Sequence, residues 1–406
     1  MSSNYGNSIL FANYNQDATS LLVGSHIGFS IYSLENMKKL KRSYENKHMK
    51  DVIIVERYYS SSLVTVVSRQ SPRKLCIYHI QENSEIFPTN FTNSILAVKM
   101  NKKHLIVCIE EHIFVHNVKD AQVTHVIRDT PPNTNGVIDL TSSGDSLIAY
   151  PGSVKTGEVH IFDATNLTAL GVTITAHSNP LAALKFSYDG KYLATASVRG
   201  TVIRVFGIPS GERLFEFQRG SWGAAINSLA FSMDGQYLAS SSNTETVHVF
   251  KLDKSSEDQP QLRQNVDDSA SSWMGYFSKA ASEYLPTQMS EILQRGTSFA
   301  FAKLPTVGQK NVVALPVIDG KLRLIVTTSD GYLYCYSIER LGGECELTEQ
   351  HRVGPGYDQK SHRGEICGGN EVLGVTTGRH NEANERHCVD NEDAMGDRPP
   401  MSHSAE

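Results

Sequence analysis

The sequence predicts an all-β protein, a seven-bladed WD40-type β-propeller followed by a disordered C-terminal tail. The first observation is a short aromatic strand pattern that occurs seven times, at residues 31–34, 77–80, 115–118, 161–164, 205–208, 249–252 and 335–338. Their first residues are 46, 38, 46, 44, 44 and 86 positions apart. The five short intervals fit the roughly 40 to 45 residues of a four-stranded blade. The last interval fits one repeat plus an insertion.

The second observation is a shared order of strands and turns within the copies. Residues 181–208 and 226–252 each read as an alternating apolar strand, an Asp-Gly turn, a strand ending in small residues, and the aromatic strand. A fourth strand with period-two alternation follows at residues 213–217 and again at 299–304. We therefore expect one propeller domain over residues 8–350, because radial repetition of small sheets leaves only short edges exposed.

Two segments fall outside the repeats. Residues 253–297 are an insertion within blade six. Residues 351–406 carry ten acids and six bases, are punctuated by Gly and Pro, and show no periodicity. This composition predicts a disordered tail.

Composition excludes several classes of protein. With 406 residues, 40% apolar and 20% charged, the chain has the balance of a soluble globular protein. A net charge of −5 argues against a nucleic-acid partner. The first fourteen residues do not resemble a secretion signal, and no apolar run reaches the eighteen or so residues of a membrane span. We expect a cytoplasmic protein with a peripheral membrane role at most.

Catalytic chemistry has no candidate in the sequence. No nucleophile, base and orienting group can be named together, and no phosphate-binding glycine motif or metal-spaced cluster of Cys and His is found. The six cysteines lack C-x-x-C spacing and indicate reduced thiols. We therefore expect no enzyme, no catalytic residue, no metal site and no cofactor.

Polar residues concentrate in blades five and six. Blade five contributes Thr195, Ser197, Gly200, Thr201 and Arg204; blade six contributes Ser242, Asn243, Thr244, Thr246 and His248; Gln218-Arg219-Gly220 lies between them. Hydroxyls, an exposed glycine backbone, an Arg and a His are donors that a phosphate group requires. Residues 181–220 hold six bases and three acids, a basic patch that suggests an anionic partner. The alternative is that these side chains only form hydrogen bonds between strands.

The insertion carries an unusual set of large apolar residues. Trp273, Met274, Tyr276 and Phe277 occur almost together. Such a cluster is typical of an interface with protein or membrane. The alternative is a loop that folds back and caps the propeller. Seven acids and four bases between residues 253 and 297 oppose binding to an anionic surface, so insertion would depend on apolar contact.

Three segments resemble a known family. Gly200-Thr-Val-Ile-Arg-Val-Phe206, Ser241-Ser-Asn-Thr-Glu-Thr-Val-His248 and Tyr284-Leu-Pro-Thr-Gln288 are similar to the PROPPINs, specifically their animal WIPI branch, and the likeness covers about residues 8–350. It implies an effector of phosphatidylinositol 3-phosphate and phosphatidylinositol 3,5-bisphosphate that acts in autophagosome formation. The expected location is cytoplasmic, with peripheral binding to phagophore, preautophagosomal and endosomal membranes.

The resemblance also assigns residues by position. It implies a first phosphoinositide site at Thr195, Ser197, Gly200, Thr201, Arg204 and Gln218, and a second at Arg219, Gly220, Ser242, Thr246 and His248. It implies a membrane loop that uses Trp273, Met274, Tyr276, Phe277, Tyr284 and Leu285. Recruitment of the autophagy lipid-conjugation machinery is implied at grooves between early blades, where Lys102, Lys103, His104, Glu110 and Glu111 are charged or titratable.

One departure from the family pattern bears on affinity. The family has an Arg-Arg-Gly triplet that directs one guanidinium into each site, and this chain has Gln218-Arg219-Gly220. Loss of one charge-assisted hydrogen bond costs about 1.5–3 kcal/mol, roughly tenfold to a hundredfold in affinity. We expect a weakened first site and a better preserved second one. A protein-interaction scaffold with weak lipid binding, or a generic propeller adaptor, are the alternatives.

Overall fold

The computed structural model describes residues 9–253, 296 and 298–355. The chain divides into two units, Met1–Gln359 and Lys360–Glu406, and the second lies wholly outside the described residues. The expected membrane-loop residues Trp273, Met274, Tyr276, Phe277, Tyr284 and Leu285 also lie outside them.

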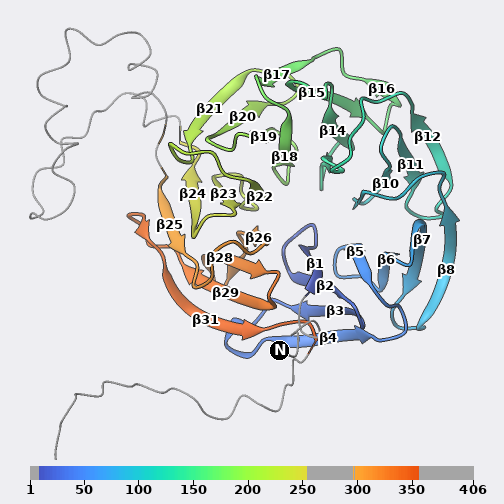
Figure 1. Cartoon of the computed structure of the whole chain (residues 1–406), viewed down its shortest axis with the longest axis horizontal. Helices are drawn as coiled ribbons and strands as arrows, with labels where there is room; N and C mark the ends of the chain where they lie inside the picture. Colours follow the sequence, from blue (N-terminus) through green and yellow to red (C-terminus); the bar gives the residue numbers. More distant parts are fainter. Residues whose placement is uncertain (1–8, 254–295, 297, 356–406) are drawn as a thin grey trace, which may run out of the picture. The chain divides into compact units, whose positions relative to one another are not determined.

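Seven sheets, antiparallel except for one short parallel strand in the sixth, surround a common axis, which confirms the predicted seven-bladed propeller (Figure 1). Blades 1 to 3 consist of β1 (Ile9–Tyr14), β2 (Ser20–Ser25), β3 (Gly28–Ser33) and β4 (Lys41–Asn46); β5 (Val52–Arg57), β6 (Leu63–Ser68), β7 (Ser71–His79) and β8 (Ser84–Asn90); β9 (Ala97–Met100), β10 (His104–Cys108), β11 (Ile113–Asn117) and β12 (Val123–Ile127). Blades 4 and 5 consist of β13 (Asp139–Leu140), β14 (Leu147–Pro151), β15 (Gly157–Asp163), β16 (Thr168–Ala169) and β17 (Ile174–His177); β18 (Leu181–Phe186), β19 (Tyr192–Ser197), β20 (Val202–Gly207) and β21 (Arg213–Gln218).

Blades 6 and 7, like blade 4, each contain a fifth, short strand. They consist of β22 (Ile226–Phe231), β23 (Tyr237–Ser242), β24 (Thr246–Lys251), β25 (Ala300–Lys303) and β30 (Gly343–Glu344); β26 (Asn311–Ala314), β27 (Val317–Ile318), β28 (Lys321–Thr328), β29 (Tyr332–Ser337) and β31 (Glu346–Arg352). The seven aromatic segments seen in the sequence fall on β3, β7, β11, β15, β20, β24 and β29, the third main strand of each blade. The last strand, β31, runs two residues past the boundary expected at residue 350.

The Asp-Gly turns form as predicted, between the first two strands of blades 5 and 6. Gly190 and Gly235 have φ of +74° and +69°, a left-handed conformation that glycine adopts without steric cost. The preceding aspartates accept hydrogen bonds from Ser187 Oγ (2.7 Å) and Ser232 Oγ (2.5 Å). These local bonds end the first strand and start the second.

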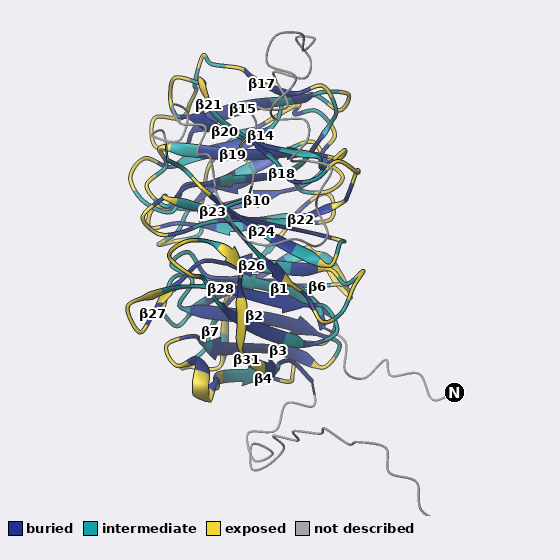
Figure 2. Cartoon of the chain, turned by 90° about the vertical axis from the view of Figure 1, so that its left-hand side faces the viewer, coloured by how far each residue is buried: buried dark blue, intermediate teal, exposed yellow. Residues whose placement is uncertain are grey.

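The core lies between neighbouring blades. Phe217 of β21 stacks on Phe250 of β24 with ring centroids 4.7 Å apart, which joins blade 5 to blade 6. In Figure 2 the strands are largely buried or intermediate, and exposed residues gather in the turns. The four described cysteines, Cys76, Cys108, Cys335 and Cys345, are buried and unbridged.

The ring closes by packing, without an exchanged strand among the described residues. Blade 1 contains only N-terminal strands and blade 7 only C-terminal strands. Tyr14 Oη and Thr327 Oγ1 lie 2.8 Å apart across this junction, and Ile9 N donates to Ser329 O at 3.2 Å. Gly354 N donates to Tyr32 Oη at 2.8 Å.

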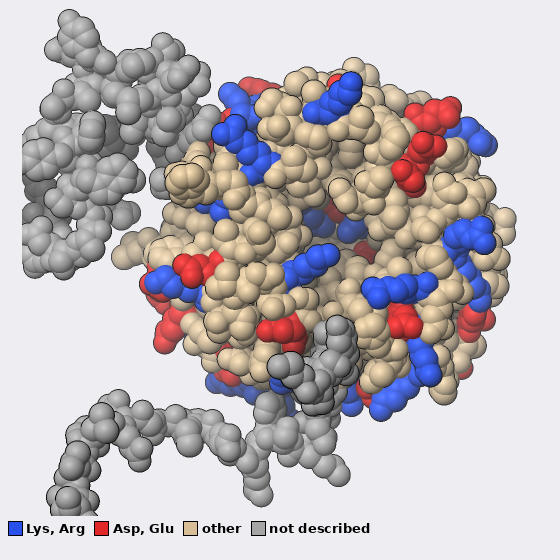
Figure 3. All heavy atoms as spheres, in the orientation of Figure 1, with Lys and Arg blue, Asp and Glu red and all other residues tan. Residues whose placement is uncertain are grey.

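The axis of the ring is a hollow of about 340 Å³, visible in Figure 3 with basic and acidic atoms inside it. Asp139 Oδ1 lies 3.3 Å from Lys185 Nζ and 3.9 Å from Lys99 Nζ. Glu56 Oε2 accepts from Asn13 Nδ2 at 2.9 Å, and burial raises the pKa of Glu56. The first strands of five blades thus meet in one polar cluster.

Helical structure is minimal in the described part of the chain. Residues Met37–Lys39 (η1) form a single 3-10 turn, started by Asn36, whose Oδ1 accepts from Lys39 N at 3.2 Å. No helix among the described residues has the length and apolar character needed to span a bilayer.

Candidate functional site

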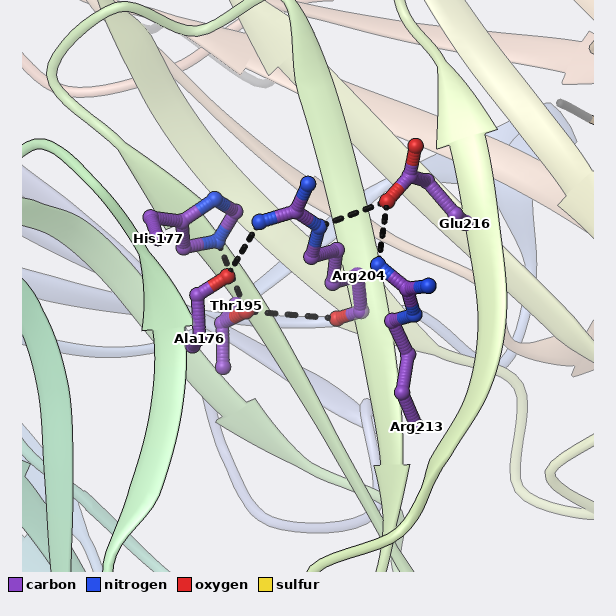
Figure 4. Close-up of polar contacts among 6 residues, drawn as sticks. All are labelled: Ala176, His177, Thr195, Arg204, Arg213 and Glu216. Carbon is purple, nitrogen blue, oxygen red and sulfur yellow. Dashed lines mark hydrogen bonds and ion pairs between the residues drawn. The ribbon is translucent and has the colours of Figure 1, made fainter. Parts of the chain in front are cut away.

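The first polar cluster, which we call the His177 cluster, consists of His177, Thr195, Arg204, Arg213 and Glu216, where blade 4 meets blade 5 (Figure 4). Thr195, Arg204 and Glu216 are direct cross-strand neighbours on β19, β20 and β21. Arg204 Nε donates to Glu216 Oε2 at 2.7 Å, and its Nη1 donates to the carbonyl oxygen of Ala176 in blade 4. The cluster therefore joins the two blades.

Charge within this cluster is already balanced in part. Glu216 accepts from both Arg204 and Arg213, so one carboxylate faces two guanidiniums. His177 Nε2 lies 2.9 Å from Thr195 Oγ1. Burial, and then the charge of Arg204, lower the pKa of His177 to about 4. At neutral pH the cluster contains a neutral imidazole and a net charge near +1.

We expect His177 to make the protein less stable in acid. Its folded pKa lies below the unfolded value of 6.5, so the unfolded state binds the proton first as pH falls. The contribution of this pKa difference to the free energy of unfolding is fully present above pH 6.5 and is lost as pH falls from 6.5 to about 4. About 2 kcal/mol of it is lost by pH 5. Urea unfolding of wild type and His177→Gln at pH 7 and pH 5 measures this loss, and equal losses in the two proteins would contradict it.

The second polar cluster, which we call the Arg219 cluster, consists of Arg219, Ser242, Thr246 and His248, where blade 5 meets blade 6. Arg219 is only 7% exposed, and its Nε donates to Gly200 O at 2.8 Å. Burial lowers the pKa of this guanidinium. Arginine nevertheless stays protonated in proteins, so the group carries its charge. Arg219 is therefore a buried cation held by backbone carbonyls, with no carboxylate partner among the described residues.

His248 completes this cluster from β24. Its Nε2 lies 3.2 Å from Thr246 Oγ1, and its Nδ1 is buried without a hydrogen-bond partner among the described residues. Burial, and then the nearby charge of Arg219, lower the pKa of His248 to about 4. The hydroxyls of Ser240 and Ser241 are also buried without partners there. Unsatisfied buried donors are rare and indicate a strained or ligand-binding region.

The alternation of strand β21 explains why these clusters lie on opposite sides of it. Successive side chains of a strand point to opposite faces. Glu216 reaches Arg204 toward blade 4, whereas Phe217 stacks on blade 6, and Arg219 follows Phe217 by two positions. Gln218 shares the parity of Glu216, and its Nε2 donates to Gly220 O at 2.6 Å. By this alternation, consecutive positions 218 and 219 direct their side chains to opposite faces of the strand.

The structure divides the residues expected in the first site. Thr195 and Arg204 meet in the His177 cluster, and Ser197 lies buried at the end of β19. Gly200 and Thr201 instead contact the second cluster through their backbone. Gly200 O accepts from Arg219 Nε, and Thr201 O accepts from Arg219 N at 2.9 Å and from Gly220 N at 3.4 Å. Ser242 Oγ lies 2.8 Å from Thr244 Oγ1 in the turn before β24.

The basic patch expected over residues 181–220 is largely neutralised by ion pairs. Lys185 pairs with Asp139, and Lys191 Nζ lies 3.0 Å from Asp189 Oδ2. Arg204 and Arg213 share Glu216. On the face shown in Figure 3, basic and acidic residues alternate around the ring. Net charge along the sequence therefore overstates the free positive charge of this segment.

Three members of the His177 cluster, His177, Arg213 and Glu216, were not predicted as site residues from the sequence. His177 ends β17 in blade 4, outside the blade that supplies the other residues, so sequence spacing gave no link to Arg204. Glu216 could have been identified from the sequence, because it is the only acid within the alternating strand Arg213–Gln218. A charged residue in such a strand predicts a cross-strand partner on the neighbouring strand.

Comparison with known proteins identifies the family. The family model described as PROPPIN matches residues 8–353. The chain belongs to the PROPPIN family. This PROPPIN is 46% identical over 375 residues to the "WD repeat domain phosphoinositide-interacting protein 2" of Xenopus laevis, covering 91% of this chain and 84% of that one. The result confirms the resemblance to the animal branch.

Two further relatives extend the comparison. The PROPPIN described here is 39% identical over 411 residues to "Autophagy-related protein 18" of Caenorhabditis elegans, covering 98% of this chain and 97% of that protein. It also superposes on KlAtg21 in the solved complex of KlAtg21 with the coiled-coil of AgAtg16, with a TM-score of 0.66 and 24% identity. That alignment covers 86% of this chain and 100% of the other, and it supports the propeller fold.

Proposed function

We propose that this PROPPIN is a phosphoinositide effector of the autophagy pathway. It binds phosphatidylinositol 3-phosphate and phosphatidylinositol 3,5-bisphosphate through the rim of blades 5 and 6, and it associates peripherally with phagophore, preautophagosomal and endosomal membranes. It acts there by bringing autophagy proteins, including the lipid-conjugation machinery, to the membrane. The names of the frog and nematode relatives, phosphoinositide-interacting and autophagy-related, agree with this proposal.

The observation that carries the proposal is the Arg219 cluster. Arg219 is a cation without a described carboxylate partner, and it lies near the unpaired Nδ1 of His248. The hydroxyl of Thr246 contacts His248, and the hydroxyl of Ser242 contacts Thr244 in the turn before β24. A phosphate group would supply the charge and the acceptor oxygens that this cluster lacks. Arg204, by contrast, already has its charge paired with Glu216.

The His177 cluster is the proposed first site, and we infer that it binds phosphate more weakly. Glu216 competes with an anionic ligand for Arg204 and Arg213. Gln218 has no charge, and its Nε2 donates to Gly220 O. The expected guanidinium at position 218 is the group that would offset Glu216. These contacts support the expectation of one attenuated and one preserved site.

Vesicle flotation tests the proposal. Purified full-length protein is mixed with phosphatidylcholine vesicles that contain phosphatidylinositol 3-phosphate, the 3,5-bisphosphate, the 4-phosphate or none of these lipids. We expect flotation with the first two lipids only. Equal flotation with every vesicle type, or flotation with none of them, would contradict a phosphoinositide effector.

We expect Gln218→Arg to bind phosphatidylinositol 3-phosphate vesicles about tenfold to a hundredfold more tightly than wild type. The added guanidinium restores one charge-assisted contact worth about 1.5–3 kcal/mol. Gln236→Arg is the matched control, because Gln236 is exposed at the turn between β22 and β23, at the other end of blade 6. It adds the same charge away from the rim. Equal gains in both variants would show a non-specific charge effect.

A second candidate is a protein-interaction scaffold that binds lipid only weakly, which the pairing of Arg204 with Glu216 and the uncharged Gln218 favour. The related KlAtg21 has been solved with a coiled-coil partner. The charged residues expected to recruit protein do not form one surface here. Lys102 and Lys103 precede β10, whereas Glu110 and Glu111 follow it, so the strand separates the two pairs. If the protein is a scaffold of this kind, wild type would not float with the vesicles, and only the Gln218→Arg variant would.

A further inference from the structure

Trp222 is the most exposed aromatic side chain among the described residues, at 86% exposure. It lies in the loop between β21 and β22, three positions after Arg219. Arg219 Nη2 donates to Trp222 O at 2.5 Å, and Ala224 N donates to Arg199 O at 3.2 Å. These two hydrogen bonds hold the backbone of the loop at Trp222 and at Ala224, while the indole of Trp222 remains exposed to solvent.

The neighbouring turn between β19 and β20 adds two exposed residues. Val198 is 52% exposed, and Arg199 is exposed beside it. We call Val198, Arg199 and Trp222 the Trp222 patch. The two loops touch, because a Cβ atom on Gly223 would lie 3.2 Å from Arg199 O. The patch thus joins an indole, an aliphatic side chain and a guanidinium on one rigid surface.

Arg199 differs from the other bases of residues 181–220. Each of the others forms an ion pair or donates hydrogen bonds within the propeller. Arg199 has no ion pair and no side-chain hydrogen bond with any residue that the structure describes. Its charge therefore remains available to an external anion.

The position of the patch favours a lipid surface as its partner. Isolated exposed apolar side chains are ordinary on protein surfaces. Trp222, however, is hydrogen-bonded through its backbone to Arg219, the central residue of the proposed lipid site. The chain returning from the blade-six insertion reaches the same strand end, where Gln218 N donates to Gly296 O at 3.1 Å. The patch is thus continuous with the proposed membrane-binding rim.

We propose that the Trp222 patch is a second membrane-contact point of this protein. Trp222 enters the boundary between headgroups and acyl chains, where the indole ring is favoured, and Arg199 binds anionic headgroups beside it. The proposal rests on the proposed membrane function. Contacts on one rigid body act together. The patch therefore adds membrane affinity that partly offsets the missing guanidinium at position 218.

Flotation of a matched pair of variants tests the contribution to affinity. Trp222→Ala is expected to lower affinity for phosphatidylinositol 3-phosphate vesicles by about tenfold, the effect of removing one large apolar side chain from the membrane. The side chain makes no buried contact, so the fold is retained. Ile27→Ala is the control, because Ile27 is an apolar side chain, 46% exposed, in the turn between β2 and β3 of blade 1, away from blades 5 and 6. It is expected to leave affinity unchanged.

Fluorescence tests the location of the indole directly, since the chain has only two tryptophans. In Trp273→Phe, all tryptophan emission comes from Trp222. Spectra are recorded on the fraction that floats with vesicles, so a change in affinity does not alter the comparison. We expect emission to shift to shorter wavelength on binding and to be quenched by lipids brominated near the headgroup end of the acyl chain.

The outcomes separate this inference from the proposed function. If wild type does not float with either lipid, the membrane function and this inference both fail. If wild type floats, but Trp222→Ala matches Ile27→Ala and bound Trp222 is neither shifted nor quenched, only the inference is overturned. In that case Trp222 faces away from the membrane and is free to bind a protein.

Discussion

Replacement of Arg219 by alanine is expected to lower the affinity for phosphatidylinositol 3-phosphate vesicles by about a hundredfold. The change removes the only guanidinium of the Arg219 cluster, whose charge-assisted hydrogen bonds to phosphate are worth about 1.5–3 kcal/mol. Because the remaining contacts share one rigid body, the loss of one site also lowers the avidity of the others. Flotation over a series of lipid concentrations measures the change.

A structural effect of Arg219→Ala must be separated from an effect on lipid binding. The variant leaves Gly200 O and Trp222 O without a donor, so we also expect a lower free energy of unfolding. Arg57→Ala is the matched control. In blade 2, Arg57 donates to Ser61 O at 2.9 Å and to Ser60 O at 2.7 Å, and burial lowers its pKa as well. It should lose stability and keep lipid affinity. Equal affinity losses in both variants would contradict a binding role for Arg219.

A titration adds a readout that does not depend on lipid. The charge of Arg219 is one of the two causes that hold the pKa of His248 near 4. In Arg219→Ala the pKa of His248 should rise toward its ordinary value, while the pKa of His177 should stay near 4, because Arg204 is its charged neighbour. Imidazole proton NMR measures both values in one experiment.

The repeat and its turns could be predicted from the sequence because they depend on local chemistry. Asp189-Gly190 and Asp234-Gly235 form turns through bonds to residues two positions away. Two features of the sheets were not predictable in this way. Strand β30 pairs in parallel with β25, and Gly296 forms a parallel bridge with Phe217. Each contact involves one or two residues far apart in sequence, which is too short to produce a periodic pattern.

The sequence singled out some of the residues that form the two clusters, but not His177, Arg213 or Glu216, and not the grouping of the set. Residues on β19, β20 and β24 stood out because polar side chains interrupt apolar alternation there. The partners of Arg204 were missed, since Glu216 and the carbonyl oxygen of Ala176 reach it from another strand and another blade. Gly200 was expected to expose its backbone to phosphate. In the structure its carbonyl oxygen binds Arg219.

Gly200 is also the position where we expect a large loss of stability on substitution. We expect Gly200→Ala to lower the free energy of unfolding by about 3 kcal/mol or more, because two costs combine. Gly200 has φ of +62°, a conformation that side chains other than glycine rarely adopt. Its Cβ would also lie 1.9 Å from Ala224 O, a backbone atom that cannot move without displacing the loop that carries Trp222. Urea unfolding at pH 7 measures the loss.

Gly220→Ala provides the contrast within the same pair of loops. A Cβ atom there would meet no heavy atom within 4 Å, and its φ lies outside the left-handed region, so we expect stability to change little. If both substitutions were tolerated equally, the contact between the two loops would be dispensable. If only Gly200→Ala destabilises, the close approach of Gly200 to Ala224 is what holds Arg219 and Trp222 in place on the rim.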